Sequence, residues 1–121
     1  LGVQTDVQFF WATGLFSALL DNAPAYLTFL AGALGLHGLD MKNANHVGEF
    51  VARHGHSLIA ISLGATFFGA LTYIGNGPNL LVKAIAQDAR VPTPSFLGFI
   101  VKYAAPVLLP IFAVLSILFF R

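Results

Sequence analysis

Two apolar runs open the chain, at residues 7–20 and 25–36, and the polar stretch DNAP separates them. As a helix the first run is about 21 Å long, which is short of the ~30 Å hydrocarbon core of a bilayer. The pattern fits one transmembrane helix kinked at Pro24, or a re-entrant helical hairpin over residues 7–36 with DNAP at its tip. Because Asp, Asn and Pro are turn residues and a residue before proline avoids the helical region, we favour the hairpin.

A polar interval follows at residues 37–57. Within it Val47, Phe50 and Val51 recur at helical spacing. This pattern predicts a short amphipathic helix lying at a membrane interface.

The second half of the chain is again apolar, with two interruptions. Residues 58–86 are long enough to cross a bilayer, but GNGPN at residues 75–79 interrupts them, which predicts a broken transmembrane helix. The two prolines of residues 87–95 predict a loop. Residues 96–120 are apolar and long enough to span the membrane with some tilt.

Composition strengthens the membrane assignment. Charged residues make up 9% of the 121 residues, apolar residues 57%, and the mean hydropathy is +0.80; soluble domains carry about 25% charged residues. The net charge of +1 gives no sign of a nucleic-acid partner. The chain has no cysteine, and Ser17 and Ser62 have no evident base beside them, so we expect neither an enzyme nor a cofactor. The aromatic groups at residues 9–11 and 119–120 are expected to be packing residues or interfacial anchors.

Asp21 and Asn22 are the first candidates for binding. A carboxylate at bilayer depth costs about 2.5–3.5 kcal/mol on insertion scales, so it is usually retained because it binds a cation, a proton or a base. The alternative is that the turn lies at the interface, where Asp21 only caps a helix. We favour the binding role.

The GNGPN break supplies a second set of candidates. Unwinding frees backbone carbonyls near Ile74 and Gly75, which would coordinate a cation. Asn76 and Asn79 add neutral donors and acceptors, and Thr72 lies one turn earlier. A simple kink for helix packing is the alternative, but a kink does not need two asparagines.

Three residues are expected to act as structural hinges: Pro24, Gly77 and Pro78. Pro78 suits the first turn of the second half-helix, because an N–H group there has no partner within the helix. The free N–H groups of that turn favour an anionic group.

Four histidines lie in the polar interval, at positions 37, 46, 54 and 56, together with Glu49. A metal site is one interpretation. We favour solvated, pH-responsive side chains, because histidines in a polar segment more often have that character. No resident metal is therefore expected.

The two motifs SALLDNAPAYLTF and GALTYIGNGPNLLVKAIA together resemble the C-terminal half of the ion transporter superfamily. More narrowly, the chain is similar to bacterial members named for sodium:proton antiport or for citrate transport. The resemblance extends over nearly all of residues 1–121, so we interpret them as a C-terminal transport-domain fragment of a longer protein. It implies an all-α membrane protein that forms one half of an inverted repeat, with the transport site where hairpin tips meet broken helices.

The hairpin tip distinguishes the branches of this superfamily. The dicarboxylate branch has Ser-Asn-Thr there, whereas this chain has Asp21-Asn22-Ala23. The resemblance to the Asp-Asn-x-Pro tip of the antiporter branch is closer. An unneutralised carboxylate would also repel an anionic substrate.

We therefore expect a sodium:proton antiporter in which Asp21 is the exchange carboxylate. A buried aspartate binds either a proton or Na⁺, since desolvation disfavours its bare charge and a bound cation compensates for it. Asn22, the carbonyls near Gly75, and Asn76 would complete the cation shell, with Asn79 as a further candidate.

Two alternatives remain: a cation-coupled citrate or dicarboxylate symporter, and a membrane scaffold that transports nothing. The expected partners are the lipid bilayer, the N-terminal repeat of the same protein, a small ion or carboxylate substrate, and a second copy in a homodimer. The expected location is the bacterial inner membrane, with residues 37–57 outside and residues 87–95 in the cytoplasm.

Overall fold

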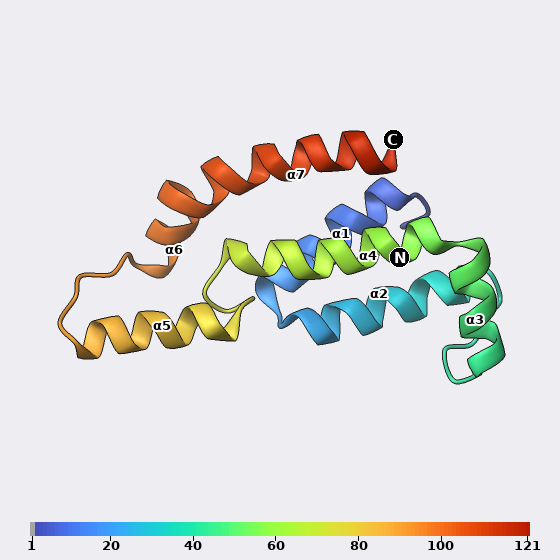
Figure 1. The fold of residues 1–121 in the computed structure, drawn as a ribbon, viewed down its shortest axis with the longest axis horizontal. Helices are drawn as coiled ribbons and strands as arrows, with labels where there is room; N and C mark the ends of the chain where they lie inside the picture. The colour runs from blue at the N-terminus through green and yellow to red at the C-terminus, as the bar shows by residue number, and fades with distance from the viewer. Residues whose placement is uncertain (1) are drawn as a thin grey trace.

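A computed structural model describes residues 2–121, and helices dominate this part of the chain (Figure 1). The expectation of an all-α protein is confirmed for these residues. In chain order the elements are α1 (Asp6–Leu19), α2 (Asn22–Leu36), α3 (Ala44–Arg53), α4 (Gly55–Phe68), the 3-10 turn η1 (Gly69–Leu71), α5 (Gly77–Asp88), α6 (Phe96–Phe99), the π-helical turn η2 (Ile100–Ala104) and α7 (Ala105–Phe120).

Helices α1 and α2 form an antiparallel hairpin, not one kinked helix (Figure 1). Leu20 and Asp21 are both extended, and they end one helix and begin the next. The Asp21 carboxylate accepts a hydrogen bond from the Asn22 N–H at 2.8 Å. Pro24 lies in the first turn of α2, where its missing N–H costs little because that group has no partner within a helix.

Helix α3 occupies the polar interval. Asn43 caps it by accepting from the Asn45 N–H at 3.0 Å, and Glu49 pairs with Arg53 at 2.8 Å on its exposed face. Phe50 is fully buried, so one face packs against the rest of the chain. Helix α4 begins at Gly55, three residues earlier than the apolar run predicts.

The predicted interruption of the third apolar segment is present. Helix α4 ends at Phe68, η1 tightens the next turn, and α5 starts only at Gly77. In Figure 1, α5 continues in roughly the direction of α4 beyond an irregular stretch. Pro78 lies in the first turn of α5, as predicted.

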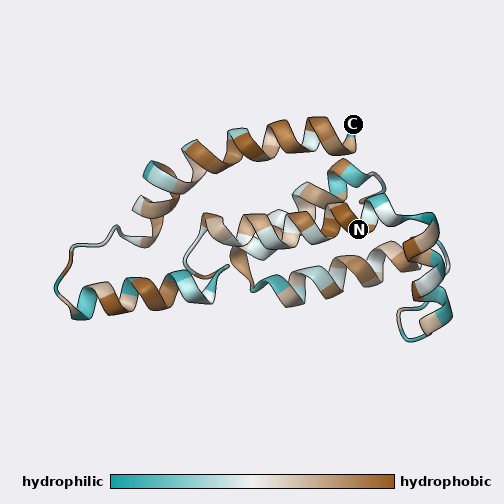
Figure 2. Ribbon diagram, in the orientation of Figure 1, coloured by the Kyte–Doolittle hydropathy of each residue, from teal (hydrophilic) through white to brown (hydrophobic). Residues whose placement is uncertain are grey.

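Within residues 2–121, one helix, Phe96–Phe120, is long and apolar enough to cross a membrane. Its π-helical turn ends at Ala104, two residues before Pro106, and the Ala105 N–H donates to the carbonyl of Ile100. Leu118 is 71% exposed and Leu81 on α5 is 61% exposed. Figure 2 shows how apolar residues dominate α7 along its length. Such surfaces require lipid or further protein to cover them.

An aromatic cluster joins both ends of the chain. Phe68 stacks on Phe112 with ring centroids 4.4 Å apart, and Phe10 lies 5.4 Å from both Phe68 and Phe120. Trp11 meets Phe68 edge-on at 5.3 Å. The packing role expected for the terminal aromatic groups is confirmed for Phe10, Trp11 and Phe120.

Helices α1 and α4 approach each other very closely because glycines lie between them. A Cβ atom added at Gly64 would fall on the carbonyl oxygen of Phe10, and one added at Gly14 would fall on the ring of Phe68. Small residues permit this kind of backbone contact between apolar helices. The close contact holds the end of α1 beside the end of α4, and that end contains the polar groups described below.

We expect Gly64→Ala to destabilise the protein by ~1–3 kcal/mol, because the carbonyl of Phe10 cannot swing aside as a side chain would. Thermal or denaturant unfolding in detergent measures the effect. The matched control is Gly35→Ala in α2, where an added Cβ meets nothing within 4 Å. Equal unfolding midpoints for the two variants would contradict the close packing.

Candidate functional site

The tip of the α1–α2 hairpin lies against the break between α4 and α5. The side-chain amide of Asn22 reaches three oxygen atoms: Ser17 Oγ at 2.7 Å, the Ala65 carbonyl at 2.9 Å and the Gly75 carbonyl at 3.1 Å. Since carbonyl oxygens only accept, the amide nitrogen belongs on this side and donates to them. We call Ser17, Asn22, Ala65 and Gly75 the tip–break junction.

Ser17 completes the hydrogen bonding of the junction. Its hydroxyl donates to the carbonyl of Ala65, which frees its lone pairs to accept from Asn22. Ser17 is fully buried and Asn22 is half-buried. Every donor here has an acceptor, as buried polar groups require.

Thr72 ties the end of α1 to the same break. Its hydroxyl donates to the carbonyl of Ala18 at 2.6 Å and accepts from the N–H of Gly75 at 2.8 Å. The Ala18 carbonyl belongs to the last turn of α1, where carbonyls lack a partner within the helix. One buried hydroxyl therefore satisfies backbone groups from both segments.

Glycine is required at position 75 by the same contact. A Cβ atom there would lie 2.6 Å from the Ser17 carbonyl oxygen and 3.0 Å from the Ala18 Cα. At Gly69 it would lie 2.5 Å from the Asn22 side chain and 2.6 Å from the Gly75 carbonyl oxygen. The break packs directly on the backbone of α1, with no room for side chains.

The predicted site residues therefore divide into two groups. Asn22, Thr72 and Gly75 come together at the junction. Asp21 is adjacent in sequence but exposed, and its carboxylate caps α2. Asn76 precedes α5 as its N-cap without a side-chain capping bond.

Asn79 and two of the expected hinges lie outside the junction. Asn79 faces a different pocket, lined with Tyr73 and Lys83 among others. Gly77 and Pro78 are exposed in the first turn of α5.

Sequence reasoning did not identify Ser17 or the Ala65 carbonyl as part of the site. The available signal for Ser17 was a hydroxyl in the last turn of an apolar helix, directly before the DNAP tip. The Ala65 carbonyl could not be identified from the sequence, because every residue carries a backbone carbonyl.

An open groove of about 420 Å³ leads to Asn22. Its walls come from the start of α2 and the middle of α4. The lining residues are Asn22, Ala23, Tyr26, Ser62, Ala65 and Thr66. The groove gives one side of the junction access to the surroundings of this chain.

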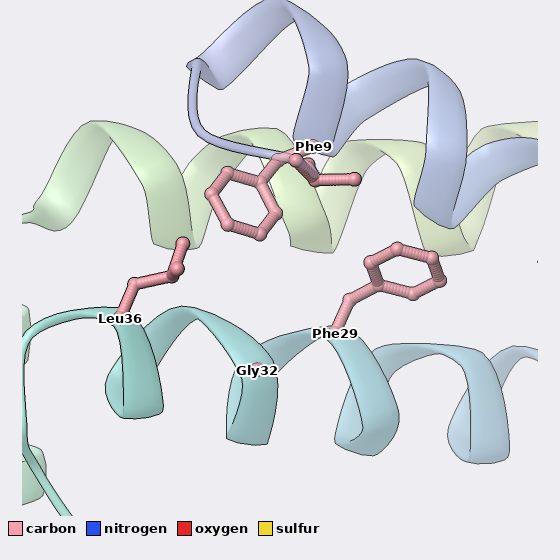
Figure 3. A pocket seen from close by; sticks show the side chains of 5 residues that line it. Phe9, Phe29, Gly32 and Leu36 are labelled. Carbon is pink, nitrogen blue, oxygen red and sulfur yellow. The ribbon is translucent and has the colours of Figure 1, made fainter. Parts of the chain in front are cut away.

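A second, smaller cavity lies between α1 and α2 (Figure 3). It has a volume of about 70 Å³, and its lining residues are Val3, Phe9, Phe29, Gly32 and Leu36. None of these side chains is polar.

Three histidines of the polar interval make side-chain contacts within it. His37 and His54 stack with ring centroids 3.6 Å apart, and His46 Nδ1 accepts from the N–H of Asp40 at 3.0 Å. Over residues 2–121, no three His, Asp or Glu side chains gather in a way that would hold a metal ion.

Apolar helices that are interrupted around satisfied polar groups, beside a helix long enough to span a bilayer, are features of membrane transport proteins. The comparison with protein families agrees. The family described as "Putative citrate transport" matches residues 1–120, and the chain belongs to it. It is therefore a membrane protein of a transport family, in agreement with the resemblance to the citrate-transporter branch.

No curated protein matches the chain, and neither does any solved structure. The family description is thus the functional statement that comparison provides.

We expect Thr72→Val to destabilise the full-length protein by ~1–3 kcal/mol, because it leaves the Ala18 carbonyl and the Gly75 N–H without their buried partner. Unfolding in detergent measures this. Thr28→Val is the matched control, since Thr28 is exposed on α2. A Thr72→Val variant as stable as the control would show that the hydroxyl does not hold the junction together.

Proposed function

We propose that this chain is part of a cation-coupled secondary transporter, working as a sodium:proton antiporter, with its cation site at the tip–break junction. The observation that supports this most is the convergence of four oxygen-bearing groups: the Ser17 hydroxyl, the Asn22 amide and two backbone carbonyls. Hydroxyl, amide and carbonyl oxygens are the ligands that hard cations take in proteins.

The orientation of the Asn22 amide gives the site two states. With its nitrogen toward Gly75 and Ser17, the amide closes the junction through hydrogen bonds of 3.1 and 2.7 Å. A cation between these groups would need the amide oxygen on that side and a wider spacing. Cation binding would therefore turn the amide and separate the tip from the break, which couples binding to movement.

Asp21 is the proposed exchange carboxylate. It lies next to Asn22 in sequence, and it is exposed within residues 2–121. We propose that the N-terminal repeat of the same protein covers it, since inverted repeats meet at the transport site in this kind of transporter. Covered in this way, the carboxylate would bind a proton or Na⁺ in turn.

The proposal assigns a membrane role to each element. The α1–α2 hairpin is re-entrant, α3 lies at the interface, α4 and α5 form the broken transmembrane helix, and α6 to α7 span the bilayer. The apolar surface of α7 would face lipid, the N-terminal repeat or a second copy in a homodimer. The membrane would be the bacterial inner membrane.

A cation-coupled citrate symporter is the second candidate, and the family description favours it. In that case the junction would hold the coupling cation, and Asp21 would help to neutralise it. A scaffold that transports nothing is the remaining alternative. Cysteines placed at positions 22 and 76 would react with aqueous reagents in a transporter, but not in a scaffold.

We expect a sodium pulse to change the internal pH of proteoliposomes that contain the full-length protein, as a trapped dye would report. Asp21→Asn should abolish the change, because an amide cannot exchange a proton for Na⁺. Asp40→Asn, an exposed acidic residue outside the junction, should leave it intact. Sodium-dependent uptake of labelled citrate without a pH change would instead favour the symporter.

We expect Asn22→Asp to make stability depend on sodium. Without a cation the new carboxylate faces carbonyl oxygens and lacks the amide donor, which should cost about 1–3 kcal/mol. Na⁺ should restore stability by pairing with the carboxylate, whereas choline should not. Unfolding midpoints in the two salts measure this. Asn43→Asp, at the N-cap of α3, is the control, because Asn and Asp cap equally well. Equal midpoints in both salts would contradict a cation site at the junction.

A further inference from the structure

We propose that a second pocket, between α5 and the loop after it, binds a carboxylate group of a soluble organic anion through Lys83 and Asn79. The inference rests on the second candidate function above, the cation-coupled citrate symporter. The pocket has a volume of about 220 Å³. Its lining residues are Tyr73, Asn79, Val82, Lys83, Ala86, Thr93 and Phe99.

Lys83 brings an ammonium group that has one N–H left to donate. Its Nζ donates to Thr93 Oγ1 at 2.8 Å and to the Pro94 carbonyl at 3.1 Å. An ammonium has three N–H groups, so one remains for a ligand. Within residues 2–121, no carboxylate lies within 4.0 Å of this nitrogen.

The surroundings favour the positive charge but do not neutralise it. Nζ lies 5.2 Å from the centroid of the Tyr73 ring, in a cation–π arrangement. Tyr73 is 7% exposed, so the ring is a fixed wall of the pocket. A half-buried cation with neutral partners is a site that an anion would complete.

Asn79 adds a second donor at the right spacing. It lies four residues before Lys83 on α5, and residues four apart share a helix face. Its side-chain amide makes no hydrogen bond with the part of the chain described here, residues 2–121. An amide N–H and an ammonium N–H facing one pocket are suited to the two oxygens of a carboxylate.

The pocket and the tip–break junction share one break in the chain. Tyr73 follows Thr72, which is tied to the junction, and its ring lines the anion pocket. A bound carboxylate and a bound cation would therefore act on the same irregular segment, residues 72–76. This arrangement would let each ligand influence the other through the break.

A purely structural role for Lys83 predicts different behaviour. If its ammonium serves only to clamp the loop to α5, Lys83→Gln should lower the unfolding midpoint and leave the affinity for citrate unchanged. If the pocket binds an anion, Asn79→Asp should also block it, because the new carboxylate would pair with Lys83 and occupy the place of the ligand.

The test is calorimetric titration of citrate into the full-length protein in detergent, at fixed sodium concentration. We expect Lys83→Gln and Asn79→Asp each to weaken citrate binding by about tenfold or more, as loss of a charge-assisted hydrogen bond does. Lys42→Gln, at an exposed lysine that does not line the pocket, should change the affinity by less than about threefold. Unchanged citrate affinity in folded Lys83→Gln and Asn79→Asp would overturn the inference, and so would an equal loss in Lys42→Gln.

A lipid phosphate would meet the same donors, so a second measurement separates the two sources. Native mass spectrometry after reconstitution with phosphatidylglycerol counts the lipids that each variant retains. If Lys83→Gln and Asn79→Asp lose bound phosphatidylglycerol but keep citrate affinity, the pocket holds a lipid headgroup and the proposed carboxylate is wrong.

Citrate affinity tests the anion pocket, whereas the response of stability to sodium tests the cation site, so the two proposals can fail separately. Combined with Asn22→Asp, Lys83→Gln should keep the sodium-dependent unfolding midpoint that Asn22→Asp introduces at the junction. Loss of citrate binding with that response intact supports the anion pocket. Loss of the sodium response in the combined variant would mean that Lys83→Gln disturbs the break itself, and it would overturn the assignment of Lys83 to a separate anion pocket.

Discussion

The structure depends on one constraint: a helix that ends in a buried position must have its free backbone groups satisfied by another part of the chain. Helix α1 stops at Leu19, and α4 gives way to an irregular stretch after Leu71. Each interruption supplies what the other lacks. The Thr72 hydroxyl serves the Ala18 carbonyl and the Gly75 N–H, while the Asn22 amide serves the Gly75 carbonyl.

That mutual satisfaction is possible only because the two segments nearly touch. Gly64 and Gly75 lie against the backbone of α1, where a Cβ atom would collide with carbonyl oxygens. Beside these glycine contacts, aromatic rings from α1, α4 and α7 pack against one another. The contact between α1 and α4 thus combines close packing with a short line of polar groups at one end.

Two groups of polar atoms lie on either side of the break, and the two ligands proposed above have opposite charges. Oxygen atoms converge at the tip–break junction, while the Lys83 ammonium and the Asn79 amide, which makes no side-chain hydrogen bond within residues 2–121, line the pocket with Tyr73. The break contributes to both the junction and the pocket, because Thr72 is bonded at the junction and the next residue, Tyr73, lines the pocket. Membership of the citrate transport family makes such a pairing chemically sensible, since a carboxylate that crosses a membrane requires compensating positive charge.

The sequence by itself determined the helical class, the two interruptions at DNAP and GNGPN, the amphipathic helix of the polar interval and the long apolar helix at the end. These features are local: each follows from the spacing of apolar residues or from turn residues within one segment. Only the tertiary structure decided that Asn22, and not Asp21, reaches the break, that Ser17 and the Ala65 carbonyl join it, and that Asn79 lines a pocket with Lys83 instead. The direction in which a side chain points depends on how each helix is rotated against its neighbour, and backbone carbonyls carry no signature in sequence, so contacts between residues some fifty positions apart follow only from the packing.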